Sequence, residues 1–200
     1  MVAEYGEENV YNFSIGNPSE PAPEEVKEAI KAILDEEPMK RIHGYNASSS
    51  GDAGARAAVA EHLNRLHGTA FTADNIMMTV GAAGGLNVLF KTILDPGTEV
   101  ITFAPYFGDY NYYVENSGGT LKVVAPNAPT FQPDAAAMEE LINENTRAVI
   151  INSPNNPTGV IYSEQSLKEI GEVLACKSAE AIDHCVSVIA ADEIIITVIA

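Results

Sequence analysis

Residues 148–159 read AVIINSPNNPTG. The first four are apolar and mostly β-branched, without the polar–apolar alternation of a half-exposed strand, which is typical of a strand covered on both faces. The residues that follow contain two X-Pro steps and a glycine, which predicts a rigid, extended loop. Rigid amides are good hydrogen-bond donors, so we expect this loop to contact an oxygen of a ligand.

The same change from apolar run to loop recurs along the chain from residue 74. Strands are predicted at 76–80, 100–104, 121–125, 148–151 and 186–190. Helices are predicted near 23–36, 53–67, 84–94, 106–116, 134–143 and 163–176, with Asp134 and Ser163 as N-caps and Gly68 as a C-cap. This alternation predicts an α/β fold, a mostly parallel sheet with helices on both faces. Ligands of such sheets bind beyond the carboxyl ends of the strands.

The two ends of the chain differ from this pattern. Residues 1–22 contain Pro18 and Pro21 and are followed by Pro23, so this segment is expected to be irregular. Residues 194–200 form an apolar, largely β-branched run with no turn signal after it. Because a free terminus is usually solvated, we expect this run to continue into a core, or to pair with a segment outside these 200 residues. A truncated domain, or an anomaly of sequence, is favoured over a natural terminus.

Composition excludes several classes of partner. The formal net charge is −17, whereas nucleic-acid binding requires clustered Lys and Arg, and an anionic membrane surface would repel such a chain. Cys176 and Cys185 are too few for a disulfide framework and fit no common zinc spacing, which indicates buried thiols of a reducing compartment. The N-terminal residues lack the features of a signal peptide, and charges interrupt every apolar run before about 18 residues. We therefore expect a cytoplasmic protein.

Three more loops follow or end predicted strands. Residues 79–87 are nearly all small and open a helix, so they suit a phosphate, although a tight strand–helix turn would need the same residues. Residues 103–110 carry four aromatic side chains, which suit a planar cofactor or the packing of a helix start. Residues 190–193 end in Asp192 and Glu193, which could cap a following element or face a cationic ring nitrogen.

Taken in order, these elements resemble the class I/II aminotransferases, the fold-type I pyridoxal phosphate enzymes. The resemblance covers the N-terminal portion of the family and runs from Gly16 to Asp192. Its motifs are 44–45 with 51–56, 81–86, 105–107, 155–159 and 191–193, and Asn-Pro-Thr-Gly at 156–159 is the most specific of them. The resemblance implies two regions: 1–45, an N-terminal arm and a helix of the small domain and dimer interface, and 46–200, the first part of the large cofactor-binding domain.

The resemblance also implies contacts to the cofactor, pyridoxal 5'-phosphate. The amides and small side chains of Ala82, Ala83 and Gly84 would hold the phosphate at a helix N-terminus. Phe107 would stack on the pyridine ring. Asn156 would donate a hydrogen bond to the 3-oxygen of the ring.

Further implied contacts lie near the two ends of the chain. Asp192 would pair with the ring nitrogen and keep it protonated, so that the ring acts as an electron sink. Tyr45 resembles the tyrosine that reaches across a homodimer interface to the partner's phosphate, and Gly16 would lie near the substrate carboxylate. Ile195 stands where the family usually has a tyrosine that also bonds the 3-oxygen, and an isoleucine cannot donate.

The predicted activity is transfer of an amino group from an amino acid to a 2-oxo acid, with no metal. The Schiff-base lysine and two arginines of the family should follow Asp192 and are absent, so the 200-residue chain should be inactive alone. None of the seven lysines matches a family lysine motif: Lys27, Lys31, Lys40, Lys91, Lys122, Lys168 and Lys177. A lyase or synthase of the same fold and a non-catalytic dimerising relic stay open. A nucleotide-binding domain is disfavoured, since Glu99 is too near the glycine loop to hold a ribose and Asp109 lies in the aromatic motif.

Overall fold

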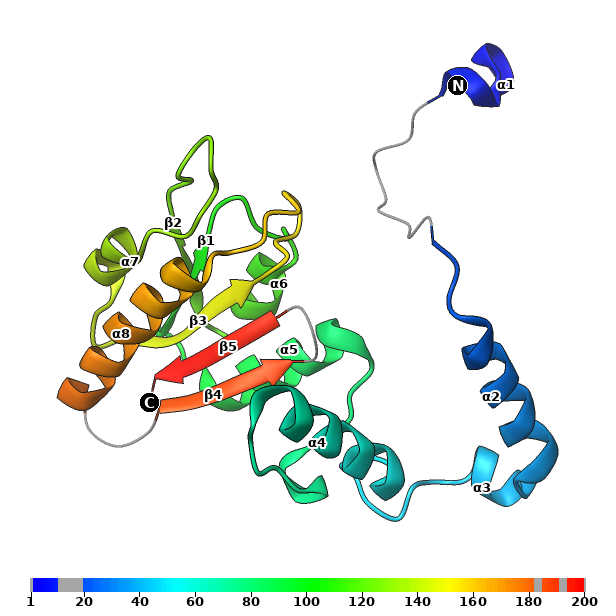
Figure 1. Ribbon diagram of the computed structural model, residues 1–200. Coiled ribbons are helices and arrows are strands. Elements are labelled where there is room, and N and C mark those ends of the chain that lie inside the picture. The colour runs from blue at the N-terminus through cyan, green and yellow to red at the C-terminus, as the bar shows by residue number, and fades with distance from the viewer. Residues whose placement is uncertain (1, 11–19, 182–184, 191–193, 200) are drawn as a thin grey trace. The chain divides into compact units, whose positions relative to one another are not determined.

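The computed structural model describes residues 2–10, 20–181, 185–190 and 194–199 (Figure 1). The chain divides into two compact units, Met1–Ala53 and Gly54–Ala200. The first contains α1 (Val2–Tyr5), the 3-10 helix η1 (Glu7–Asn9), α2 (Glu24–Glu36) and α3 (Met39–His43). The expectation that residues 1–22 are irregular is wrong for α1 and η1, two short helices.

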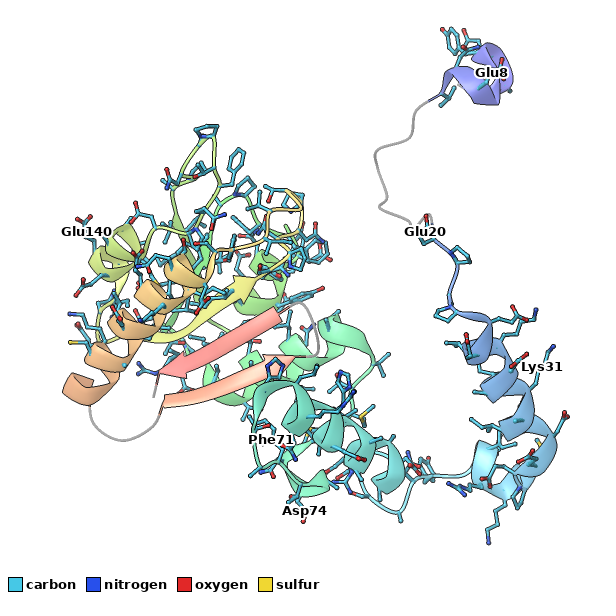
Figure 2. All side chains as sticks on the ribbon, viewed as in Figure 1. Glu8, Glu20, Lys31, Phe71, Asp74 and Glu140 are labelled. Atoms are coloured by element: carbon cyan, nitrogen blue, oxygen red, sulfur yellow. The ribbon has the colours of Figure 1, made fainter. Side chains whose placement is uncertain are left out.

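Helix α2 is the longest element of the first unit and fits the prediction for residues 23–36. It begins after Pro23, whose fixed φ suits a helix start, and it ends at Glu36, two residues before Pro38. Apolar side chains recur at helical spacing along one stripe of this helix: Val26, Ile30, Ile33 and Leu34. None of the residues of α2 is buried, so this stripe is exposed. Lys31 points away from the helix into solvent (Figure 2).

The second unit holds a sheet with helices around it. Its helices are α4 (Ala53–His67), η2 (Ala73–Asn75), α5 (Gly81–Ile93), α6 (Tyr110–Glu115), α7 (Ala135–Leu141) and α8 (Glu164–Ala181). Its strands are β1 (Glu99–Phe103), β2 (Thr120–Val124), β3 (Thr146–Asn152), β4 (Cys185–Ala190) and β5 (Ile194–Ile199), in the order β2-β1-β3-β5-β4. β1 pairs in parallel with β2 and β3, whereas β5 is antiparallel to both β3 and β4.

Both faces of the parallel strands are covered, as the unbroken apolar runs predict. Ile101 and Val149 belong to a core with α7 and α8. Their neighbours Val100 and Ile150 belong to a second core with α5 and α6 (Figure 1). Successive side chains of a strand point to opposite faces, so a strand between two helical layers carries apolar side chains on both faces.

Three predicted caps are confirmed. The carboxylate of Asp134 accepts from the N–H of Ala137 at 2.9 Å, at the start of α7. The hydroxyl of Ser163 accepts from the N–H of Ser166 at 3.1 Å, at the start of α8. Gly68 follows α4 and has φ of +66°, which is the left-handed conformation that a glycine adopts without strain.

The segment after α4 returns alongside that helix. Asn64 donates from Nδ2 to the carbonyl of Phe71 at 2.8 Å and accepts from the Phe71 N–H at 2.7 Å. Arg56, which is buried, donates to the carbonyl of Ala73 at 2.7 Å and lies 3.8 Å from the carboxylate of Asp74. Figure 2 labels Phe71 and Asp74 on this segment. These contacts fix the path of the chain toward α5.

Two expectations are wrong, and one alternative for the end of the chain is not observed. Residues 76–80 form no strand, because no strand among the described residues pairs with them; Met77, Met78 and Val80 are accordingly exposed. The apolar run at the end of the chain forms β5, which pairs with β3 and β4 of the same chain, so the alternative of pairing with a segment outside these 200 residues is not the one observed. Cys176 is exposed rather than buried, and the side chain of Cys185 lies outside the described part.

Candidate functional site

A pocket of about 370 Å³ lies where α5, the β1–α6 loop and the end of β3 meet. It lies beyond the carboxyl ends of two parallel strands, β1 and β3, where ligands of α/β sheets bind. The pocket is lined by Ala82, Ala83, Leu86, Phe107, Asp109, Tyr110, Tyr113, Asn152 and Asn156.

The N-terminus of α5 forms one wall. Gly81 has φ of +66°, and the N-cap residue Val80 makes no side-chain hydrogen bond to the helix. The first N–H groups of a helix lack intrahelical partners and carry a partial positive charge, which favours an anion. The methyl side chains of Ala82 and Ala83 are exposed at this helix end, so they leave the approach to these N–H groups open.

Aromatic rings form the second wall. Phe107 is 36% exposed and packs edge-on against Tyr110, with ring centroids 5.7 Å apart and planes at 80°. Tyr106 stacks on Tyr110 with centroids 6.4 Å apart. Tyr110 is buried, so it is a fixed support for both rings. The partly exposed ring of Phe107 offers a flat surface to a planar ligand.

Asparagines form the third wall. Asn152 is the last residue of β3 and is buried, and its Oδ1 accepts from the backbone N–H of Asn156 at 2.7 Å. The side chain of Asn156 is exposed to the pocket. Between these two residues, Asn155 is buried and does not line the pocket. Asn156 therefore presents an exposed amide to the pocket, while Asn152, which also lines it, and Asn155 hold the shape of the loop.

The hydroxyl groups beside the pocket keep their protons at neutral pH. Burial raises the pKa of Tyr110 to about 12, and the nearby Tyr162 and Tyr113 add to the shift. Burial also raises the pKa of Tyr113, followed by the charge of Asp109, whose carboxylate accepts from the Tyr113 hydroxyl at 3.4 Å. A protonated phenol is a hydrogen-bond donor. Among the described lining residues, the pocket thus combines phenol hydroxyl groups with one carboxylate, that of Asp109.

The structure brings together four of the residues selected from the sequence: Ala82, Ala83, Phe107 and Asn156. Gly84 does not line the pocket, and its N–H donates to the carbonyl of Val80 at 3.3 Å. Gly16 and Asp192 lie outside the described residues. The backbone of Ile195 pairs with Ile151 in the sheet, but its side chain is likewise outside the description.

Tyr45 belongs to the first unit and is fully exposed, with a relative accessibility of 106%. Its predicted contact with a partner subunit remains a prediction. In the described part of the chain, no group of three His, Cys, Asp or Glu side chains could hold a metal ion. No helix there is long and apolar enough to cross a membrane.

Sequence reasoning missed five lining residues: Leu86, Asp109, Tyr110, Tyr113 and Asn152. Signals for three of them were present. Tyr110 and Tyr113 follow Phe107 at intervals of three, the spacing that places residues on one side of a helix. Asn152 is the polar residue that ends an apolar strand, at the edge where ligands bind.

Comparison with known proteins shows which family builds this site. The family model described as aminotransferase class I and II matches residues 8–179. The chain belongs to the class I and II aminotransferases. This confirms the family that the motifs at 81–86, 105–107 and 155–159 indicated.

Individual aminotransferases agree with this family in sequence and fold. The chain is 39% identical over 163 residues to the probable aspartate/prephenate aminotransferase of Thermus aquaticus, a match covering 80% of this chain and 41% of that protein. The crystal structure of an aminotransferase from Eubacterium rectale has a TM-score of 0.86 at 48% identity, covering 90% of this chain and 45% of that one. Aspartate aminotransferase from Thermus thermophilus with maleate has a TM-score of 0.73 at 34% identity, covering 80% and 41%. This aminotransferase chain thus spans less than half the length of each.

Proposed function

We propose that the complete protein is a pyridoxal 5'-phosphate-dependent aminotransferase, which moves an amino group from an amino acid to a 2-oxo acid. One observation carries the proposal: a single pocket joins the N-terminus of α5, the ring of Phe107 and the amide of Asn156. Family membership supports it, as do the aminotransferase names of the relatives. The activity is proposed for the whole protein because the chain spans less than half of those relatives.

The residues of the pocket fit this cofactor. The helix N-terminus with Ala82 and Ala83 suits a phosphate, which needs unpaired N–H groups and a close approach to the backbone. Phe107 provides a flat apolar surface for a pyridine ring. The amide of Asn156 can donate to an oxygen on that ring. The volume of about 370 Å³ lies in the usual range of small-molecule sites.

The part of this chain in the reaction is to hold and orient the ring. When bound, pyridoxal phosphate supplies an electron-accepting ring that stabilises negative charge on the substrate carbon. The N–H groups at the start of α5 anchor one end of the bound molecule. Phe107 fixes the plane of the ring, and Asn156 fixes its rotation within that plane. Tyr113, whose hydroxyl donates to the carboxylate of Asp109 at 3.4 Å, lines the aromatic wall.

Three further assignments in this proposal come from the family resemblance. Asp192 pairs with the ring nitrogen, Gly16 lies near the substrate carboxylate, and Tyr45 contacts the phosphate of a partner subunit. The full exposure of Tyr45 in the single chain supports the last of these, because an exposed ring is accessible to a partner subunit. We accordingly propose a homodimer that works in the cytoplasm.

The test is a half-reaction with the full-length protein. The protein is loaded with pyridoxal phosphate, dialysed, and mixed with single amino acids in the absence of an acceptor. Release of one 2-oxo acid per active site, followed by return of the starting absorbance when a second 2-oxo acid is added, would support the proposal. Release of ammonia or carbon dioxide instead would indicate a lyase. Failure to retain the cofactor would contradict the proposal and favour a non-catalytic role.

A further inference from the structure

Asn155 connects the two loops that carry the proposed cofactor contacts. It is 5% exposed, belongs to the loop that bears Asn156, and bonds to the β1–α6 loop, which bears Phe107. We propose that Asn155 is a positioning residue that sets the orientation of Phe107 relative to Asn156, an inference that rests on the proposed function. Asn155 does not line the pocket, so it acts through these neighbours rather than on the ligand.

The nitrogen of the Asn155 side chain links to the first loop. Nδ2 donates to the carbonyl of Pro105 at 3.2 Å, and Pro105 precedes Phe107 by two residues. The second proton of Nδ2 goes to the hydroxyl oxygen of Tyr162 at 3.2 Å, and Tyr162 is itself buried. Both protons of the amide are therefore used. The Pro105 contact joins residues 50 positions apart, and it holds the loop of Phe107 against that of Asn156.

The oxygen of the same side chain holds its own loop. Oδ1 accepts from the hydroxyl of Thr158 at 2.7 Å and from the Thr158 N–H at 3.3 Å. The Asn155 backbone adds two bonds: its N–H donates to the carbonyl of Val160 at 2.8 Å, and its carbonyl accepts from the N–H of Gly159 at 2.7 Å. With both ends fixed, the plane of the Asn155 amide is determined. Because the plane of the amide is fixed, the bond to the Pro105 carbonyl fixes the loop of Phe107 relative to the loop of Asn156.

An aspartate at this position separates the two links. Asn155→Asp keeps an oxygen that accepts from Thr158, so the loop of Asn156 retains its own bonds. Tyr162 can turn its hydroxyl proton toward the new carboxylate. The carbonyl of Pro105 cannot donate, and it would face a negatively charged oxygen in place of a donor. The substitution therefore breaks the link between the loops selectively.

Asn64 provides a matched control for this substitution. It is part-buried in α4, its Nδ2 donates to a backbone carbonyl, and its Oδ1 accepts from a backbone N–H and from the hydroxyl of Thr69 at 2.8 Å. These are the same kinds of partner that Asn155 has in Pro105 and Thr158. Asn64 does not line the pocket. Asn64→Asp therefore reproduces the chemical change and its general cost in stability away from the site.

The experiment uses the full-length protein loaded with pyridoxal phosphate. It measures the cofactor dissociation constant, the visible circular dichroism per bound cofactor, and the unfolding midpoint without cofactor. We expect N155D to weaken cofactor binding about tenfold, which corresponds to about 1.4 kcal/mol, and to change the dichroism of the cofactor that remains bound. We expect N64D to lower the unfolding midpoint and to leave both cofactor readouts at the wild-type values.

Equal cofactor affinity and dichroism in N155D and wild type would overturn the inference, as would the same cofactor defect in N64D. If N155D does not fold, Thr158→Val replaces the test: it removes the 2.7 Å bond that fixes the amide plane, and binding should weaken about threefold. Unchanged binding in T158V would then overturn the inference. A wild-type protein that binds no cofactor would overturn the proposed function together with this inference, so the two failures are distinguishable.

Discussion

The backbone N–H of Asn156 donates to the side-chain oxygen of Asn152 over 2.7 Å. Asn152 ends β3 and is almost completely buried, so its position is set by the sheet. The bond therefore fixes the backbone of Asn156, four residues later in the loop, relative to the end of the strand. The exposed amide of Asn156 thus projects from an anchored backbone, although it belongs to a loop.

This relationship predicts the effect of removing the Asn152 amide. In the full-length protein, Asn152→Ala should weaken pyridoxal phosphate binding about tenfold, because Asn156 loses the acceptor that fixes its backbone. Asn152→Asp keeps an acceptor oxygen and should retain most of the affinity. Equilibrium dialysis against free cofactor measures both. Equal losses of cofactor affinity in the two variants would show that the acceptor oxygen at residue 152 does not determine cofactor binding.

The start of α5 predicts a steric effect. Ala83→Leu should reduce cofactor affinity by about two orders of magnitude, because a branched side chain at an exposed position of the helix end blocks the approach to its N–H groups. Leucine and alanine are both good helix formers, so the fold should persist. Ala58→Leu, an exposed change on α4, is the control and should bind normally. Full affinity in A83L would place the phosphate elsewhere.

Tyr110 predicts a loss of stability in base. Its pKa is about 12 in the folded protein against 10.0 for an ordinary tyrosine, so the unfolded chain releases this proton first. The contribution of the protonated Tyr110 to the free energy of unfolding is on the order of 2 kcal/mol. It is fully present below pH 10 and is lost as pH rises to about 12. Tyr110→Phe should therefore lose less stability across this window than wild type, as measured by urea unfolding at each pH. Parallel curves for the two proteins would contradict the assignment.

The proposed homodimer predicts complementation between two inactive variants. Tyr45→Ala damages the contact to the partner's site, and Phe107→Ala damages the site of its own subunit. Unfolding and refolding an equal mixture should give half mixed dimers with one intact site each, and hence about a quarter of wild-type activity. Each variant refolded alone is the control. A mixture no more active than the variants alone would show that Tyr45 serves its own subunit.

The order of strands and loops could be predicted from the sequence because each step has a local cause. A strand between two helical layers carries apolar side chains on both faces, so the apolar runs within β1 and β3 indicated these strands. Small residues at the start of a helix leave room for a phosphate, and the family resemblance then assigned Ala82 and Ala83 to it, although the strand expected before them does not form. The caps at Asp134 and Ser163 followed from the side-chain oxygen that a helix N-terminus requires.

What could not be predicted depends on partners distant in sequence. Residues 76–80 have strand-like composition, but a strand exists only where a neighbour pairs with it. The antiparallel direction of β5 depends on its pairing with β3, which its own apolar run does not encode. Asn155 and Asn156 are identical in type, and the contact to Pro105, 50 positions earlier, distinguishes the buried one from the exposed one.

The exposure of Met77 and Met78, at 62% and 43%, provides a chemical reporter in the chain. Peroxide converts accessible methionine sulfur to the sulfoxide, and covered methionines are spared. Met138, which is fully buried between α7 and the sheet, is an internal reference in the same polypeptide. The ratio of oxidised to unoxidised peptide at these positions therefore records, by mass spectrometry, whether any other segment or subunit shields residues 76–80.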